Sequence, residues 1–171
     1  MPEITKKKIL VVDDEADVRN FLQAALIEAG FEVETAEDGE TALQKIKKEK
    51  PDLISLDLVM PRRSGAKLYH ELQKNKAWVK IPVIIVTGHA RDDLGKSDLK
   101  NLIMSGPGIY LEKPVKPTNY IAAVKSILKM ETSVEEKETA EMVELQNYLK
   151  NIIDDADPDT LKKIKGIIIN K

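Results

Sequence analysis

Short runs of branched apolar residues alternate along the first 130 positions with stretches in which apolar residues recur at helical spacing. Ile9–Val12 is typical of a strand covered on both faces, because it is continuously apolar. Leu53–Leu58 and Val83–Val86 predict two further strands. Phe31–Ala36 alternates apolar and polar residues and predicts a more exposed strand, and Ile109–Leu111 predicts a fifth. This alternation constrains the fold most strongly, since five strand–helix units imply a parallel sheet with helices on both faces.

Each predicted strand is followed by a predicted helix. The five helices share apolar residues at helical spacing and are expected around Val18–Leu26, Ala42–Ile46, Gly65–Lys76, Leu99–Ile103 and Ile121–Leu128. Gly30 is well placed to end the first helix, Pro51 follows the second, and Ser97 is the expected cap of the fourth. Because crossovers between parallel strands are right-handed, few topologies remain.

The composition changes after Met130, where an acidic segment begins. Residues 131–171 carry 10 acidic and 6 basic side chains, whereas residues 1–130 carry 19 and 21. Apolar residues recur at three- and four-residue spacing from Met142 to Ala156, which predicts one helix, and Asp157-Pro158 is a good start for a second. We therefore expect a domain over residues 1–130 and an extension of two short helices over residues 131–171.

The overall composition excludes several classes of protein. The 27 Lys and Arg residues are balanced by 29 Asp and Glu, which does not suit a strongly basic nucleic-acid binder. The absence of cysteine excludes disulfide frameworks, cysteine-based zinc sites and thiol catalysis. No apolar run approaches the roughly 20 residues that cross a membrane, and no signal peptide is recognisable. We expect a cytoplasmic protein without a membrane segment, in which Lys6–Lys8 is exposed to solvent.

Polar residues stand where four of the predicted strands end. Asp13-Asp14 follows the first strand, Asp57 ends the third, Thr87 ends the fourth and Lys113 follows the fifth. In a parallel sheet these ends lie at one edge, and they converge only if the four strands are neighbours. The strand order 2-1-3-4-5 of a flavodoxin-like, doubly wound α/β fold provides that arrangement.

Three carboxylates at one edge repel each other unless a cation lies between them. A hard divalent ion with oxygen ligands is the natural partner, and Mg²⁺ suits a site with few carboxylates and several waters. Together with a hydroxyl and an ammonium group, the carboxylates suit the acceptance of a phosphoryl group. The metal ion and the lysine would neutralise charge on the phosphoryl oxygens.

Four segments carry a resemblance to a known family. They are KILVVDDE at 8–15, PDLISLDLVMP at 51–61, IPVIIVT at 81–87 and YLEKP at 110–114. In this order and at this spacing, the chain resembles the receiver domain of two-component response regulators from about Lys6 to Met130. The resemblance implies that a sensor histidine kinase or a phosphotransfer protein phosphorylates Asp57.

The resemblance also implies roles for the residues around Asp57. Asp14 and Asp57 would bind Mg²⁺ directly, Asp13 would assist through water, and the main-chain carbonyl of Val59 would be a further ligand. Lys113 would pair with Asp57 and then with the phosphoryl oxygens, next to a cis peptide bond to Pro114.

Two residues are implied to act as the switch. Thr87 would hydrogen-bond the phosphoryl group, and Tyr110 would change rotamer with it. Contacts with a downstream protein would then change without turnover of a substrate, so the chain is expected to act as a stand-alone regulator and not as an enzyme.

Three alternatives remain at this stage. The tail could make the protein a transcription regulator, although its acidity makes DNA an unlikely partner. A magnesium-dependent phosphatase of the haloacid dehalogenase type would need an Asp where Val59 stands. The tail could instead serve as a homodimerisation or docking module, with phosphorylation secondary.

Overall fold

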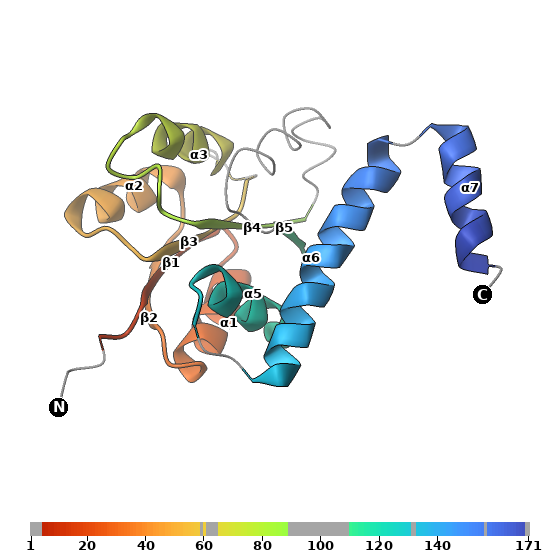
Figure 1. Cartoon of the computed structure of the whole chain (residues 1–171). Coiled ribbons are helices and arrows are strands. Elements are labelled where there is room, and N and C mark those ends of the chain that lie inside the picture. Colours follow the sequence, from red (N-terminus) through yellow and green to blue (C-terminus); the bar gives the residue numbers. More distant parts are fainter. Residues whose placement is uncertain are drawn as a thin grey trace.

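A five-stranded parallel sheet runs through the centre of the protein (Figure 1). The computed structural model describes residues 5–58, 60, 65–88, 110–130, 133–155 and 157–169. The strands share parallel pairing and are β1 (Lys8–Val12), β2 (Glu32–Ala36), β3 (Leu53–Leu56), β4 (Val83–Thr87) and β5 (Tyr110–Glu112). Their order is β2-β1-β3-β4-β5, so the predicted flavodoxin-like topology is confirmed.

Helices cover both faces of this sheet. In Figure 1, α2 (Gly39–Lys48) and α3 (Gly65–Lys74) lie on one face, and α1 (Ala16–Glu28) and α5 (Pro117–Ile127) lie on the other. The helix predicted around Leu99–Ile103 falls outside the described residues. None of the described helices combines the length and the apolar character needed to cross a membrane.

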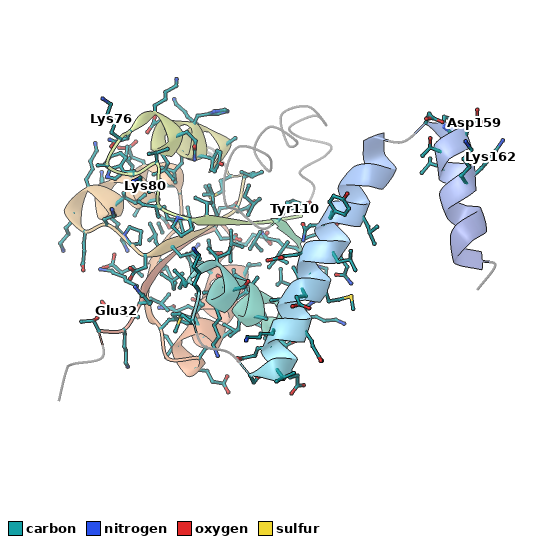
Figure 2. The ribbon with its side chains drawn as sticks, viewed as in Figure 1. Glu32, Lys76, Lys80, Tyr110, Asp159 and Lys162 are labelled. Atoms are coloured by element: carbon teal, nitrogen blue, oxygen red, sulfur yellow. The ribbon has the colours of Figure 1, made fainter. Side chains whose placement is uncertain are left out.

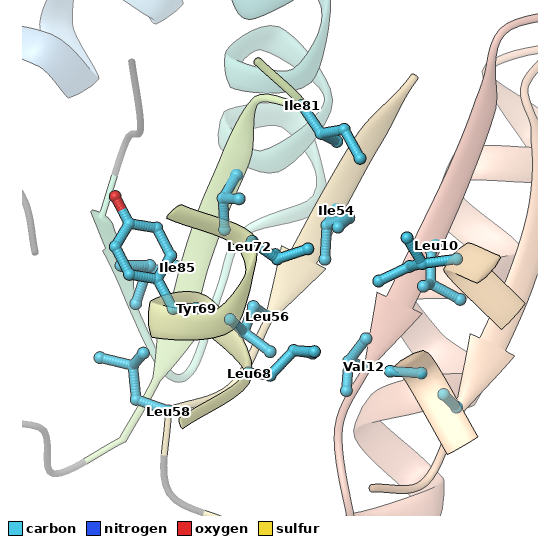
Figure 3. Close-up of a cluster of buried hydrophobic side chains, with 14 of the residues drawn as sticks. Leu10, Val12, Ile54, Leu56, Leu58, Leu68, Tyr69, Leu72, Ile81 and Ile85 are labelled. Carbon is cyan, nitrogen blue, oxygen red and sulfur yellow. The ribbon is translucent and has the colours of Figure 1, made fainter. Parts of the chain in front are cut away.

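Alternate residues along the strands contribute to two separate clusters of buried side chains. Figure 3 shows the cluster beneath α3, where Leu68, Tyr69 and Leu72 meet Ile54 and Leu56 of the sheet. On the opposite face, Ile9 and Val11 of β1 pack with Leu22 and Leu26 of α1. Because successive strand side chains point to opposite faces, each uninterrupted apolar run supplies both clusters.

Lys8 departs from the sequence-based expectation that it is exposed. It is the first residue of β1, and its side chain is buried between two carboxylates. Its Nζ lies 2.9 Å from Glu34 Oε1 and also donates to Glu49. The run Lys6–Lys8 gave no sign of this, because Glu34 and Glu49 come from elements that only the fold brings together.

The core also holds two buried hydroxyl groups. Ser55 of β3 pairs in register with Val11 of β1 and therefore faces α5, where Tyr120 is fully buried. Neither hydroxyl makes a well-formed hydrogen bond among the described residues, although the Ser55 hydroxyl is near enough to Tyr120 to oppose the effect of burial on its pKa. Burial accordingly raises the pKa of Tyr120.

Replacing Tyr120 with phenylalanine therefore tests the cost of an unpaired buried hydroxyl. An unsatisfied buried polar group costs about 1–3 kcal/mol. We expect Tyr120→Phe to raise the free energy of unfolding in urea by about 1 kcal/mol. A loss of similar size would instead show that the hydroxyl is hydrogen-bonded.

The tail consists of two helices, α6 (Val134–Asp155) and α7 (Pro158–Ile169). The inner face of α6 packs against α5, and Ala140 and Val143 are buried there. Val143 belongs to the same cluster as Ile9 and Leu22, so α6 contributes to the core beside α5.

Polar contacts fix the start of α6. Ser133 Oγ accepts from the backbone N–H of Glu136 at 3.2 Å, and the Glu136 carboxylate accepts from the backbone N–H of Ser133 at 3.1 Å. This reciprocal pair is a capping box. The same carboxylate lies 2.7 Å from Lys125 Nζ of α5. One side chain therefore caps α6 and ties it to α5.

These contacts predict a pH dependence. The hydrogen bond from Lys125, and then that from the Ser133 N–H, lower the pKa of Glu136 below its ordinary value of 4.5. A carboxyl group whose pKa is lower in the folded state stabilises the fold at pH values above 4.5. This contribution is lost as the pH falls through the folded-state pKa. We expect Glu136→Gln to lower the urea midpoint at pH 7, and this difference from wild type to shrink towards pH 3. A difference independent of pH would contradict the assignment.

Candidate functional site

The register of β1 and β3 places two buried carboxylates at the carboxyl edge of the sheet. Val12 pairs with Leu56, and the Asp57 N–H donates to the Val12 carbonyl at 2.9 Å, so the ladder extends one residue beyond β3. Asp13 is anchored likewise, its N–H donating to Ala36 O at 3.1 Å. Asp13 and Asp57 are only 1% and 3% exposed. Their side chains follow Val11 and Ser55 on the same face.

Lys113 connects the carboxylates of three residues. Its Nζ lies 3.0 Å from Asp13 Oδ2, 3.1 Å from Asp57 Oδ2 and 2.9 Å from Glu15 Oε1. The lysine follows β5, and its peptide bond to Pro114 is cis, as the family resemblance implied. Residues far apart in the sequence thus meet at one ammonium group.

The acidic residues form a compact group that could hold a cation. Asp13, Asp14, Glu15 and Asp57 each offer a carboxylate oxygen, and these oxygens lie within 4.8 Å of one another. Asp14 and Glu15 are exposed, so the group opens to solvent on one side. Such a set of oxygen donors fits a hard divalent ion that keeps several waters.

The pKa values reflect burial and pairing. Burial raises the pKa of Asp13, while the N–H of Glu15, 2.9 Å from its Oδ1, acts in the opposite direction. Burial alone would lower the pKa of Lys113, but its hydrogen bonds to Glu15 and Asp13 outweigh it and raise the pKa overall. Lys113 therefore remains a cation at neutral pH.

The structure brings together most of the residues that the sequence singled out. Asp13, Asp14, Asp57 and Lys113 form the cluster. Thr87 ends β4, and its backbone pairs in register with Glu112, immediately before Lys113. The predicted main-chain ligand Val59 falls outside the described residues.

Tyr110 lies at the start of β5, in register with Ile85, and is buried. It borders a cavity of about 380 Å³ whose lining also includes Val143, Gln146 and Asn147 of α6. Figure 2 labels Tyr110 where β5 approaches α6. The residue predicted to act as a switch is thus close to the tail.

Sequence reasoning missed the part that Glu15 plays. Glu15 stands just after the acidic pair and is exposed, which is typical of a residue at a helix start. Its contact with Lys113 joins residues 98 positions apart. The signal in the sequence was its position beside Asp13-Asp14. Three consecutive acidic residues at a strand end would have justified including Glu15 in the predicted site.

Gly65 allows the start of α3 to lie against the backbone of Asp57. It opens α3, and a Cβ at this position would lie well inside van der Waals contact of the Asp57 carbonyl oxygen and close to Leu58 Cα. Only glycine lets α3 approach the backbone of Asp57 this closely. The position of Asp57 thus depends on a residue without a side chain.

A methyl group at residue 65 should therefore disturb the Asp57 backbone. Overpacking of this kind typically costs about 1–3 kcal/mol. We expect Gly65→Ala to lower the free energy of unfolding in urea titrations by at least about 1 kcal/mol. Gly166→Ala is the matched control, because a Cβ there meets no described atom within 4 Å. Equal stability of the two variants would show that α3 moves aside at little cost.

Comparison with known proteins identifies the family. The family model of the response regulator receiver domain matches residues 9–125. The chain therefore belongs to the response regulator receiver family.

Curated relatives agree with this membership. The chain is 40% identical to the alkaline phosphatase synthesis transcriptional regulatory protein PhoP of Bacillus subtilis, over 72% of this chain and 49% of PhoP. It is 37% identical to the phosphate regulon transcriptional regulatory protein PhoB of Pseudomonas aeruginosa, over 72% of this chain and 52% of PhoB. The chain spans about half the length of the curated relatives it matches. Since both names denote transcriptional regulators, they lend no support to the expectation that DNA is an unlikely partner.

Solved structures show the same fold. The response regulator protein TrrA of Thermotoga maritima, in complex with Mg(2+)-BeF, is 35% identical with a TM-score of 0.59, covering 71% of this chain and 98% of TrrA. The chemotaxis response regulator CheY4 of Vibrio cholerae is 29% identical with a TM-score of 0.62, covering 72% of this chain and 99% of CheY4.

Proposed function

We propose that this protein is a phosphorylation-dependent response regulator in which Asp57 accepts a phosphoryl group from a histidine kinase or a phosphotransfer protein. The observation that carries the proposal is the buried Asp57 carboxylate, 3.1 Å from Lys113 Nζ within a group of acidic oxygens. A phosphoryl acceptor needs a positioned nucleophile and nearby cations that neutralise the negative charge of the phosphoryl oxygens.

In the transfer, a carboxylate oxygen of Asp57 forms a bond to phosphorus as the bond from phosphorus to the donor's imidazole nitrogen breaks. The electron pair of the broken bond stays on the imidazole, and Asp57 becomes an acyl phosphate. Lys113 already touches Asp57 and is charged, so its ammonium can pair with the phosphoryl oxygens. Asp13 and Glu15 also contact this ammonium group and help to hold it in place.

The acidic group fits Mg²⁺ as its resident ion. Asp14 and Asp57 would bind the ion directly and Asp13 through water, with the main-chain oxygen of Val59 as a further proposed ligand. The ion would neutralise negative charge on the phosphoryl oxygens. The fit rests on four carboxylate oxygens within 4.8 Å of one another and open to water, and the Mg(2+)-BeF complex of TrrA supports it.

Phosphorylation would then change contacts with a downstream protein. In this proposal the Thr87 hydroxyl binds the phosphoryl group and Tyr110 changes rotamer in response. Strand pairing places Thr87 beside β5, the strand that begins with Tyr110, and this supports a path between them. The protein would work as a cytoplasmic switch and not as an enzyme with turnover.

A labelling experiment tests the phosphoacceptor. We expect radiolabelled acetyl phosphate with Mg²⁺ to modify the wild-type chain once, and Asp57→Asn to stay unlabelled. Removal of Mg²⁺ with EDTA should abolish the label. The matched control is Asp17→Asn, an exposed carboxylate on α1 that should label like wild type. Full labelling of Asp57→Asn would refute the assignment.

The names of the relatives favour a second candidate, a transcription regulator that acts through DNA. The described surface of α6 opposes direct contact with phosphates, because Glu135, Glu138, Glu141 and Glu144 are all exposed on it. Salt-dependent retention of the chain on immobilised DNA would support this candidate.

A further inference from the structure

The helix α6 has a second apolar face, opposite the one that packs on α5. Met142, Leu145, Tyr148 and Leu149 form this outer stripe and are 46–63% exposed. The inner residues Ala140 and Val143 lie on the other side of the helix by the 3.6-residue period. Four large exposed side chains on one helix face form an unusual surface, and no element in the described part of the chain covers them.

The outer stripe carries negative charge. Glu138, Glu141 and Glu144 each stand four residues before a member of the stripe, and all three are exposed. Two stripes brought face to face would therefore place carboxylates against carboxylates. Direct pairing of α6 with the α6 of a second copy is disfavoured, and a basic apolar partner fits better.

The chain itself carries a helix of that character. On α7, Leu161 is 36% exposed, and the neighbouring Lys162 and Lys163 are exposed as well. Figure 1 shows α7 standing apart from α6, and Figure 2 labels Lys162 on it. A 12-residue helix gains little stability in water unless it packs on something.

The start of α7 is firmly set. Asp157 Oδ1 accepts from the Thr160 N–H at 2.9 Å, and its Oδ2 accepts from the Thr160 hydroxyl at 2.8 Å. Pro158 stands at the first helical position, where its fixed φ favours the helix. The cap fixes where α7 begins, and in Figure 1 the helix does not cover its own α6.

We propose that two copies of this chain exchange α7 reciprocally, so that α7 of each copy lies on the outer stripe of the other copy's α6. Leu161 faces the apolar stripe, and Lys162, about 100° further round α7, approaches the acidic residues beside it. Each copy gives one α7 and receives one, so the interface closes at two copies. The inference does not depend on the phosphoacceptor proposal.

The mass in solution is the first test. The full chain should have twice its mass of 19.2 kDa by light scattering coupled to size exclusion. Leu145→Asp should weaken dimerisation at least about tenfold, since burying a carboxylate in the stripe is unfavourable by more than about 1.4 kcal/mol. Gln44→Asp, on the exposed side of α2, is the matched control and should remain dimeric. A monomeric wild-type chain at the highest soluble concentration would overturn the proposal.

Charge exchange distinguishes a second copy from closure within one chain. One variant carries Glu141→Lys and Glu144→Lys, and the other carries Lys162→Glu. Each alone should dimerise at least about tenfold more weakly, and an equimolar mixture should restore a dimer because both interfaces of the mixed pair are complementary. Two monomers in the mixture would overturn the reciprocal exchange.

Two further variants complete the design. The matched control for charge reversal, Lys47→Glu with Lys48→Glu on the exposed side of α2, should dimerise like wild type. Asp57→Asn should also dimerise like wild type. A dimer that is lost with Asp57→Asn would contradict an interface built from α6 and α7 alone, while its persistence leaves the labelling experiment as the separate test of the phosphoacceptor.

Discussion

The ammonium group of Lys113 is the interaction on which the site depends. It touches Asp13, Glu15 and Asp57, and two of these carboxylates are almost completely buried. Buried carboxylates without a cation repel each other and lose their hydration, so a lone acidic pair would be strongly disfavoured. The lysine comes from the chain after β5, while the acids come from the chain just after β1 and β3. The site is therefore complete only when the sheet has its full order.

The sheet order and the site chemistry follow from the same few residues. Uninterrupted apolar runs demand cover on both faces, which gives the parallel sheet, and each run ends in a polar residue at the same edge. Asp13, Asp57 and Lys113 could therefore be placed together from the sequence. The sheet, its order and the helices α1, α2, α3 and α5 were predicted with boundaries within a few residues.

What sequence reasoning could not supply depends on contacts between distant elements. Lys8 looked like part of a solvated run, but its side chain is buried and its ammonium group pairs with the more exposed carboxylates of Glu34 and Glu49. Gly65 looked like a helix start, whereas its close approach to the Asp57 backbone is what requires glycine. Glu15 joined the site only through Lys113. In each case the residue type was compatible with a simpler local role, and the partner was too far along the chain to be recognised.

The attachment of α6 to α5 has a geometric consequence. The capping box and the Lys125 contact fix the first turn of α6, while the helix continues for 22 residues, about 33 Å at 1.5 Å per residue. Buried Ala140 and Val143 hold the helix further along, so the free arm is the part beyond Val143, about 18 Å long. A tilt of about 5° where α6 meets α5 would carry the tip of this arm through about 1.6 Å. The length of the arm thus enlarges a small rotation at the core into a larger displacement at its end.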